Sequence, residues 1–205
     1  MSLKRFRFLR SVRSNRTTTL PLRGLSSREM ILDREWNPPL SSDRLRLSPL
    51  TPEDAAELVV VLSDPSLYRF MGGAPPKLEE LQHRYRMLAT RRSPDGEELW
   101  LNWVIRDRHT QNALGTLEAT VRVGESSVAH IAWVLGTNAQ GNGYASESAR
   151  ALTRFLVDRG MKQVMAYIHP DHTASNRVAA AIGMEQTQIW QQKERAWQLS
   201  PESLG

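Results

Sequence analysis

One glycine-rich stretch, residues 135–147, most constrains what this chain can fold into. It joins an apolar run to an amphipathic one, so it has to lead a strand into a helix. Gly141, Gly143 and Ala145 stand where that helix would begin. Small residues there let successive backbone N–H groups face a phosphate, and the positive end of the helix adds to the attraction. The alternative is a tight turn that needs a positive φ at Gly141 or Gly143.

The apolar spacing around this stretch predicts a mixed α/β (α+β) chain, because strand and helix periods alternate along it. Strands are expected over residues 44–47, 99–106, 113–121, 128–135, 164–168, 185–189 and 195–199. Helices are expected over residues 51–62, 78–90, 145–159 and 174–182. This order places one strand–helix–strand unit inside an otherwise antiparallel central sheet with flanking helices.

The formal net charge of +5 is concentrated at one end of the chain. Residues 1–40 hold nine Lys or Arg against three acids, whereas residues 41–205 hold 18 bases and 19 acids. We therefore expect a basic, flexible arm over residues 1–40 and one near-neutral domain over residues 41–205. The arm has the composition of a mitochondrial presequence, of a membrane-surface or ribosome-binding arm, or of a disordered extension, and these alternatives stay open.

Two absences in the sequence narrow its chemistry. The chain contains no cysteine, which removes disulfides, thiolate nucleophiles and zinc–thiolate sites together, and no metal is expected. No stretch approaches the ~18 consecutive apolar residues of a membrane-spanning helix, so no membrane span is expected. A cytoplasmic location is the prediction, and organellar targeting by the Arg- and Ser-rich N-terminus is the alternative.

Three blocks of the chain resemble the GNAT superfamily of N-acetyltransferases, over about residues 41–199. Residues 140–145, Gln-Gly-Asn-Gly-Tyr-Ala, match the family's acetyl-CoA motif, Gln/Arg-x-x-Gly-x-Gly/Ala. Residues 169–175 with Gly183-Met184 resemble the block that follows it in the family. The third block resembles the N-terminal part of the branch that includes the ribosomal-protein-alanine acetyltransferases. It consists of residues 42–47, Asp64-Pro65 and Phe70-Met71.

The resemblance implies a GNAT-like fold, in which the fourth and fifth strands of a mostly antiparallel sheet splay apart and admit the pantetheine arm of acetyl-CoA. Backbone at the end of the fourth strand would pair with that arm, and amides at the helix entry would hold the pyrophosphate. The family usually has Asn at position 172, and an imidazole replaces only one of its two amide contacts. The implied cofactor-binding residues are Val134, Leu135, Gly136, Gln140, Gly141, Asn142, Gly143, Tyr144, Ala145, Ser146 and His172.

The resemblance also implies direct transfer of the acetyl group from acetyl-CoA, as co-substrate, to a primary amine. The amine attacks the thioester without an acyl-enzyme, in agreement with a chain that lacks cysteine. A protein N-terminus or a small-molecule amine is the expected acceptor, and no run of acids marks a polyamine or aminoglycoside pocket. The alternatives are a non-catalytic acyl-CoA-binding module and a ribosome- or nucleic-acid-associated protein that uses the basic arm. A homodimer is also left open.

Two residues, His130 and Ser175, are the candidates for proton transfer. In the related branch a Glu often stands at position 130, so this imidazole is a candidate to accept the ammonium proton directly or through water. The alternative is a strand histidine that only lines the acceptor cleft. Ser175 matches a serine that can donate a proton to the leaving thiolate, or it is an ordinary serine of a first helical turn.

Overall fold

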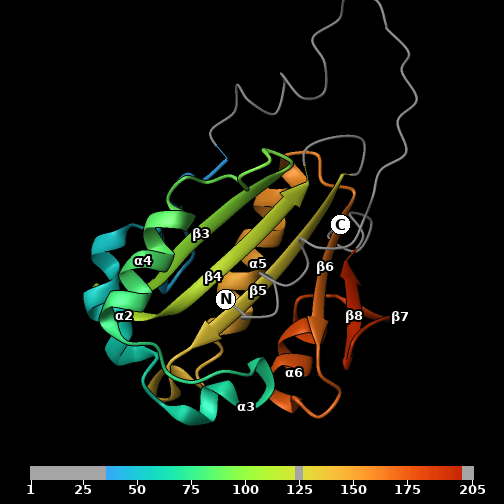
Figure 1. Cartoon of the computed structure of the whole chain (residues 1–205). Helices are drawn as coiled ribbons and strands as arrows, with labels where there is room; N and C mark the ends of the chain where they lie inside the picture. Colours follow the sequence, from blue (N-terminus) through green and yellow to red (C-terminus); the bar gives the residue numbers. More distant parts are fainter. Residues whose placement is uncertain (1–35, 123–126, 200–205) are drawn as a thin grey trace, which may run out of the picture.

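The computed structural model describes residues 36–122 and 127–199. Most of the predicted basic arm, residues 1–35, lies outside the described residues, as do residues 123–126 and 200–205. One eight-stranded sheet has the strand order β1-β2-β3-β4-β5-β6-β8-β7 (Figure 1). The strands are β1 (Leu40–Ser41), β2 (Leu45–Pro49), β3 (Glu98–Asp107), β4 (Ala113–Arg122), β5 (Val128–Leu135), β6 (Gln163–Ile168), β7 (Glu185–Gln191) and β8 (Glu194–Leu199).

The pairing of the strands confirms the predicted mixed α/β class. Neighbouring strands pair antiparallel, except that β5 and β6 pair parallel. The long connection between these two strands contains α5, so the predicted strand–helix–strand unit is present. A parallel pair requires such a crossover, because the chain has to return to the same end of the sheet.

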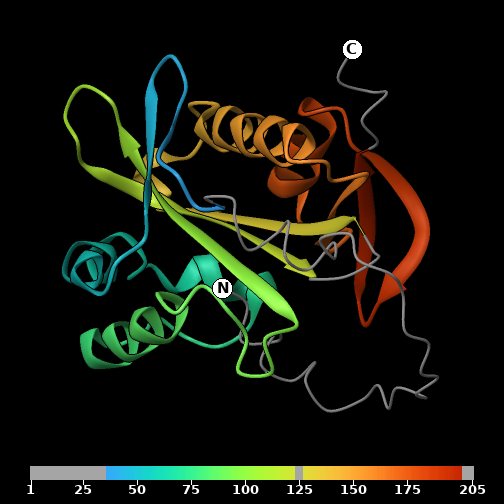
Figure 2. The same ribbon diagram turned by 90° about the horizontal axis from the view of Figure 1, so that it is seen from above.

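Helices cover both faces of the sheet, α5 on one side and α2 and α4 on the other (Figure 2). Among the described residues, no helix is long and apolar enough to cross a membrane. The helices are α2 (Ala55–Val61), α3 (Tyr68–Met71), α4 (Leu78–Leu88), α5 (Tyr144–Asp158) and α6 (Thr173–Ala181). Short 3-10 turns precede α2 at Pro52–Asp54 and α3 at Pro65–Leu67.

The α3 segment and β1 are absent from the sequence prediction. The prediction ends the first helix at Ser63-Asp64-Pro65, and the structure begins a new turn there, because the Asp64 side chain accepts the Ser66 N–H at 2.8 Å. A helix of four residues is too short to show a 3.6-residue period, and a two-residue strand shows no alternation.

Two apolar clusters form the core, one on each face of the sheet. Leu152 and Leu156 of α5 pack with Leu117 and Ile131 on the first face. Leu58, Leu81 and Tyr85 of α2 and α4 pack with Val104 on the second face. The central strand β3 is therefore buried on both sides, and its apolar residues run without alternation from Trp103 to Ile105.

The described residues at the end of the predicted arm pack against the sheet. Trp36 is 8% exposed and Asn37 is 3% exposed. The Trp103 indole donates a hydrogen bond to the Pro38 carbonyl at 2.8 Å, and the Asn37 amide donates to the Asn102 carbonyl at 3.3 Å. Residues 36–38 are therefore packed against the sheet. The predicted boundary between arm and domain at residue 40 stays a prediction.

Arg106 of β3 joins the start of α2 to the sheet through two ion pairs. Its guanidinium lies 2.6 Å from Asp54 Oδ1 and 2.7 Å from Glu57 Oε2. Glu57 also accepts the backbone N–H of Ala113, the first residue of β4, at 2.5 Å. Burial alone would raise the pKa of Glu57, but these bonds outweigh burial and lower it. The arrangement holds α2 against the β3–β4 hairpin.

We expect Arg106→Met to lower the free energy of unfolding by about 2 to 3 kcal/mol, because it leaves two part-buried carboxylates without their cation. Chemical denaturation at pH 7 measures the loss. The matched control is Arg108→Met, on the neighbouring exposed turn, with an expected change below about 0.5 kcal/mol. Equal effects of the two substitutions would contradict a specific role for Arg106.

Candidate active site

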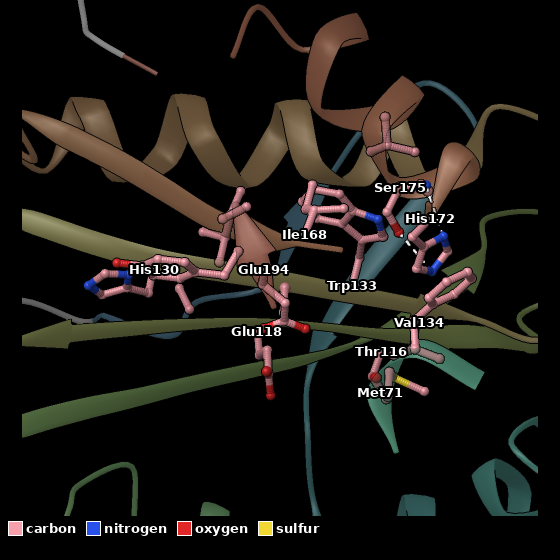
Figure 3. Close-up of a pocket in the computed structure, with 18 of the residues that line it drawn as sticks. Met71, Thr116, Glu118, His130, Trp133, Val134, Ile168, His172, Ser175 and Glu194 are labelled. Atoms are coloured by element: carbon pink, nitrogen blue, oxygen red, sulfur yellow. Dashed lines mark hydrogen bonds between the residues drawn. The ribbon is translucent and has the colours of Figure 1, made fainter. Parts of the chain in front are cut away.

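A cavity of about 1050 Å³ lies where β4, β5 and β6 meet α3 and the starts of α5 and α6 (Figure 3). Most of the residues implied by the sequence motifs line it, but Gly136 and Asn142 do not. Such a volume suffices for a substrate of considerable size. The predicted residues that line the cavity are His130, Val134, Leu135, Gln140, Gly141, Gly143, Tyr144, Ala145, Ser146, His172 and Ser175.

The divergence of β5 and β6 opens this cavity. Their register pairs are Val128–Gln163, Ala129–Val164 and His130–Met165, and the pairing ends there although β5 continues to Leu135. The lower ends of the two strands stand apart in Figure 1. Backbone groups of residues 131–135 that face β6 therefore have no partner strand in the described part of the chain. An extended ligand with amide groups of its own fits such a slot.

Close backbone contacts hold the end of β5 in place. A Cβ on Gly115 of β4 would lie 2.0 Å from the Val134 carbonyl oxygen, so only glycine allows this approach. The Gly136 N–H donates to the Leu114 carbonyl at 2.9 Å, and the Gly136 carbonyl accepts the Ala139 N–H at 2.9 Å. Both backbone groups of Gly136 are thus used inside the protein, and its implied contact with a ligand stays a prediction.

The N-terminus of α5 presents backbone N–H groups without a capping side chain. Gly143 is the N-cap, with a left-handed φ of 77°, and no side chain caps it. The first intrahelical bond joins the Glu147 N–H to the Gly143 carbonyl at 3.0 Å. The N–H groups of residues 144–146 precede this bond and have no acceptor within the helix. With the positive helix end beside them, they form a site for an anion.

Gly141 also has a positive φ, 79°, and a Cβ added there would meet no atom within 4 Å. The tight-turn alternative therefore holds at both glycines, and it is compatible with an anion site. The Gln140 side chain donates to the Leu135 carbonyl at 3.1 Å, which ties this turn back to the end of β5. The Asn142 side chain donates to the Ala139 carbonyl at 3.3 Å.

Glu147 fastens the first turn of α5 to the segment that opens the domain. Its carboxylate accepts the Ser42 hydroxyl at 2.7 Å and the Arg44 backbone N–H at 2.9 Å, and it pairs with the Arg44 guanidinium at 2.6 Å. Burial alone would raise the pKa of Glu147, but these bonds outweigh burial and lower it. The Arg44 guanidinium also lies 4.8 Å from the centre of the Tyr144 ring. Glu147 therefore stabilises the helix start, as its position in the first turn indicates.

His172 and Ser175 lie together at the start of α6, on one side of the cavity. His172 Nδ1 accepts the Ser175 backbone N–H at 3.4 Å, and His172 Nε2 lies 3.2 Å from Ser175 Oγ. The Phe70 ring of α3 stacks on the imidazole at 4.5 Å. Burial lowers the pKa of His172, and the neighbouring His169 lowers it further. The ring is therefore neutral at pH 7.

His130 lies at the other side of the cavity from this pair (Figure 3). Its ring stacks on Tyr167 of β6, with centroids 5.7 Å apart and planes 17° apart. His130 belongs to the last paired position of β5 and β6, and Val134 lies about 13 Å further along the strand. The structure thus does not bring His130 together with Ser175, and its role as a base stays a prediction.

Glu118 of β4 is a cavity residue that the sequence reasoning missed. It is 9% exposed and pairs in register with Ala132, so it shares a sheet face with His130 and lies closer to the open part of the slot. The available signal is one acid inside a strand whose other residues are apolar, small or threonine up to its final arginine. Carboxylates from separate elements join it around the cavity, at Asp95, Glu97, Glu98 and Glu194.

These five acids outnumber the two arginines of the lining, Arg122 and Arg177. Three of the carboxylates, Asp95, Glu97 and Glu98, stand together in the sequence, and the fold brings Glu118 and Glu194 to the same cavity. Within residues 36–122 and 127–199, no group of three or more His, Asp or Glu side chains could hold a metal ion. The excess of carboxylates instead makes the cavity attractive to cations.

Comparison with known proteins gives matches over most of the described residues. The family model described as an acetyltransferase (GNAT) domain matches residues 44–185. YkkB of Bacillus subtilis is 31% identical over 148 residues, which are 71% of this chain and 84% of YkkB.

Two solved structures share the fold. RimL, a ribosomal L7/L12 alpha-N-protein acetyltransferase in complex with coenzyme A, has a TM-score of 0.65 at 18% identity, covering 80% of this chain and 99% of RimL. The aminoglycoside acetyltransferase AAC(6′)-Ib in complex with coenzyme A has a TM-score of 0.64 at 18% identity, covering 78% of this chain and 96% of that protein.

We expect Glu147→Gln to lower the free energy of unfolding by about 1 to 2 kcal/mol at pH 7, because the amide loses the ion pair with Arg44. A carboxylate whose pKa is lowered on folding stabilises the protein above its unfolded pKa, near 4.5. This contribution is lost as pH falls through the folded pKa.

Melting temperatures of both proteins between pH 3 and pH 7 measure the effect. The difference between wild type and Glu147→Gln shrinks as the pH falls below about 4.5. Glu79→Gln, an exposed acid in the first turn of α4, is the matched control. A difference that is independent of pH would contradict the assigned role of the Glu147 charge.

Proposed function

Because the chain belongs to the GNAT acetyltransferase family, we propose that it transfers the acetyl group of acetyl-CoA to a primary amine of a cationic acceptor. The acetyl-CoA-dependent N-acetyltransferase activity follows from the family, and the acceptor class is the proposal. The carboxylates gathered around the cavity support it, since five acids against two arginines favour a positively charged molecule.

The residues of the slot fit acetyl-CoA. The unpartnered backbone of β5 suits the amide groups of the pantetheine arm, and the uncapped N–H groups of residues 144–146 suit the pyrophosphate. When bound, acetyl-CoA supplies an activated thioester carbonyl. Val134 and Ser175 lie on opposite walls of the cavity near the open end of the slot (Figure 3). The thioester therefore belongs near Ser175 rather than near His130.

An ammonium acceptor loses two protons in this reaction, one to a base before the attack and one that ends on the leaving sulfur. The amine nitrogen bonds to the carbonyl carbon, the carbon–sulfur bond breaks, and the electron pair leaves with sulfur. A side-chain amine with a pKa of about 10.4 is less than about a thousandth neutral at pH 7. A cationic acceptor of that kind therefore needs a base close to its ammonium group.

Glu118 is the base that we propose for such an acceptor. It is a buried carboxylate in the middle of the cavity, opposite Ala132 in register, where an acceptor amine would approach the slot. His130, the base expected from the sequence, lies diagonally beyond it on the same sheet face. A carboxylate also attracts the ammonium group that it deprotonates, which an imidazole does not.

We expect acetyl-CoA at a hundred times its dissociation constant to raise the free energy of unfolding by about 2.7 kcal/mol. Gly141→Asp should abolish this shift, because it places a negative charge where the pyrophosphate would lie. Thermal unfolding with and without acetyl-CoA measures both effects.

Gly160→Asp is the matched control for this substitution. Gly160 also has a positive φ and no atom within 4 Å of an added Cβ, but it lies past the other end of α5. Its variant should keep the full acetyl-CoA shift despite a similar backbone strain. No shift in the wild-type protein would refute the proposed binding of acetyl-CoA.

We expect polyamines and aminoglycosides to raise thiol release from acetyl-CoA more than a neutral N-terminal peptide does, because their charges meet the carboxylates of the cavity. Glu118→Gln should lower kcat/KM for the best acceptor by about 100-fold. The loss should exceed that of His130→Ala. Thiol release at pH 7 and pH 9 measures both variants, and the loss in Glu118→Gln should shrink at high pH as the amine becomes neutral.

Glu185→Gln, an exposed acid of β7, is the control for a lost carboxylate. A larger loss in His130→Ala than in Glu118→Gln would return the role of base to His130. A preference for neutral peptides over the cationic amines would refute the acceptor class.

A further inference from the structure

His172 contacts Ser175 through both of its ring nitrogens, and this determines where the imidazole proton lies. The ring is the N-cap of α6, where Nδ1 accepts the Ser175 backbone N–H. A neutral imidazole that accepts at Nδ1 carries its proton on Nε2. Nε2, which lies 3.2 Å from Ser175 Oγ, is therefore the donor to that hydroxyl.

The Ser175 hydroxyl is left with its own hydrogen free to point elsewhere. A hydroxyl oxygen that accepts the Nε2–H points its own hydrogen away from the ring, because only one hydrogen can lie between Nε2 and Oγ. Ser175 lines the cavity, so the hydroxyl donates toward the space that the leaving sulfur would occupy. Without His172, the hydroxyl would be able to rotate and donate back to any nearby acceptor.

Neighbouring elements hold the imidazole in this orientation. The Phe70 ring of α3 stacks on it at 4.5 Å with an angle of 24° between the planes. The Asn176 side chain donates to the carbonyls of His169 and Pro170, at 3.2 and 2.8 Å, which fixes the loop that leads into α6. The orientation of the His172 imidazole is thus restrained by the Phe70 ring and by the loop that Asn176 holds.

We propose that His172 is a positioning residue that aims the Ser175 hydroxyl at the leaving sulfur, an inference that rests on the proposed function. As the carbon–sulfur bond breaks, the sulfur takes the electron pair and accepts a hydrogen bond from the Ser175 O–H. His172 keeps its proton throughout. Glu118 takes one proton from the ammonium group before the attack, and the second proton, which the nitrogen releases after it has bonded to carbon, ends on sulfur. Where the resemblance implies an asparagine at position 172, this chain has an imidazole. Its two nitrogens contact the backbone N–H and the hydroxyl of Ser175.

Protonation of His172 breaks this arrangement. An imidazolium carries hydrogen on Nδ1, which would then face the Ser175 N–H as a second donor. The titratable and charged groups around the ring are His169, the exposed Asp171 that lies 3.8 Å from His169, and Arg69, whose guanidinium lies 5.2 Å from the Phe70 ring. Since burial lowers the pKa of His172 below 6.5, the loss of kcat that comes from this ring begins only below that pH.

The experiment compares kcat, KM and acetyl-CoA affinity in His172→Ala, Ser175→Ala, the double variant and His172→Asn. We expect each alanine variant to lower kcat by about 10- to 100-fold, with acetyl-CoA affinity within about threefold of wild type. The double variant should be no slower than Ser175→Ala, because both substitutions remove one hydrogen bond to sulfur.

His172→Asn restores an N-cap acceptor, so it should recover thermal stability and part of kcat. The part of the acid fall of kcat that comes from His172 should disappear in this variant, since asparagine does not titrate, while the part that comes from protonation of Glu118 and of the acceptor amine remains. Nitrogen chemical shifts of His172 in the wild-type protein should report the proton on Nε2. His83→Ala, an exposed histidine of α4, is the matched control and should leave kcat unchanged.

Full kcat in His172→Ala beside a slow Ser175→Ala would overturn the inference and leave the proposed function intact. Additive losses in the double variant, a fall of kcat at acid pH that is identical in His172→Asn and in wild type, or a proton on Nδ1 would overturn it as well. A wild-type protein that binds acetyl-CoA but releases no thiol with any amine would instead refute the proposed function, and the nitrogen shifts would still decide the orientation of the ring.

Discussion

The early end of the β5–β6 pairing is the constraint on which the rest of the structure depends. Two parallel strands that separate after three register pairs leave one edge of β5 without a partner inside the sheet. Exposed backbone groups of this kind are costly unless a ligand or water satisfies them. The rest of the fold places groups that could bind a ligand beside this edge. The cavity beside it, the anion site at α5 and the hydroxyl at α6 all lie along the gap.

The walls of this slot are held by polar contacts between distant parts of the chain. Glu147 ties the start of α5 to Ser42 and Arg44, and Arg106 ties α2 to the β3–β4 hairpin. Gly115 lets β4 approach the backbone of β5 closely enough to hold its free end. The contacts of Glu147 and Gly115 lie at the edges of the slot, whereas those of Arg106 stabilise the fold outside the cavity lining.

Local patterns in the sequence were sufficient for the element order and for the anion site. The glycines at 141 and 143, followed by an amphipathic run, predicted a strand that leads into a helix with an exposed N-terminus, and the structure has both. Short elements escaped this reasoning. The turn that carries Phe70 is too brief to show a period, yet its ring is what restrains His172. The family resemblance points to His130 of β5 as the base, and that role stays a prediction.

The sequence by itself determined the class of fold, the position of the helix that begins at the glycine-rich turn and membership of an acetyltransferase family, because these depend on neighbouring residues and on motif spacing. Only the tertiary structure decided which side chains meet. Glu118 and Glu194 are far from each other and from the acids of residues 95–98 in the chain, and the sheet brings them to one cavity. The pairing of His172 with Ser175 needed the geometry of a helix cap, and its stacking partner came from α3. Periodicity records local conformation, whereas a binding site is made of contacts between segments that the fold brings together.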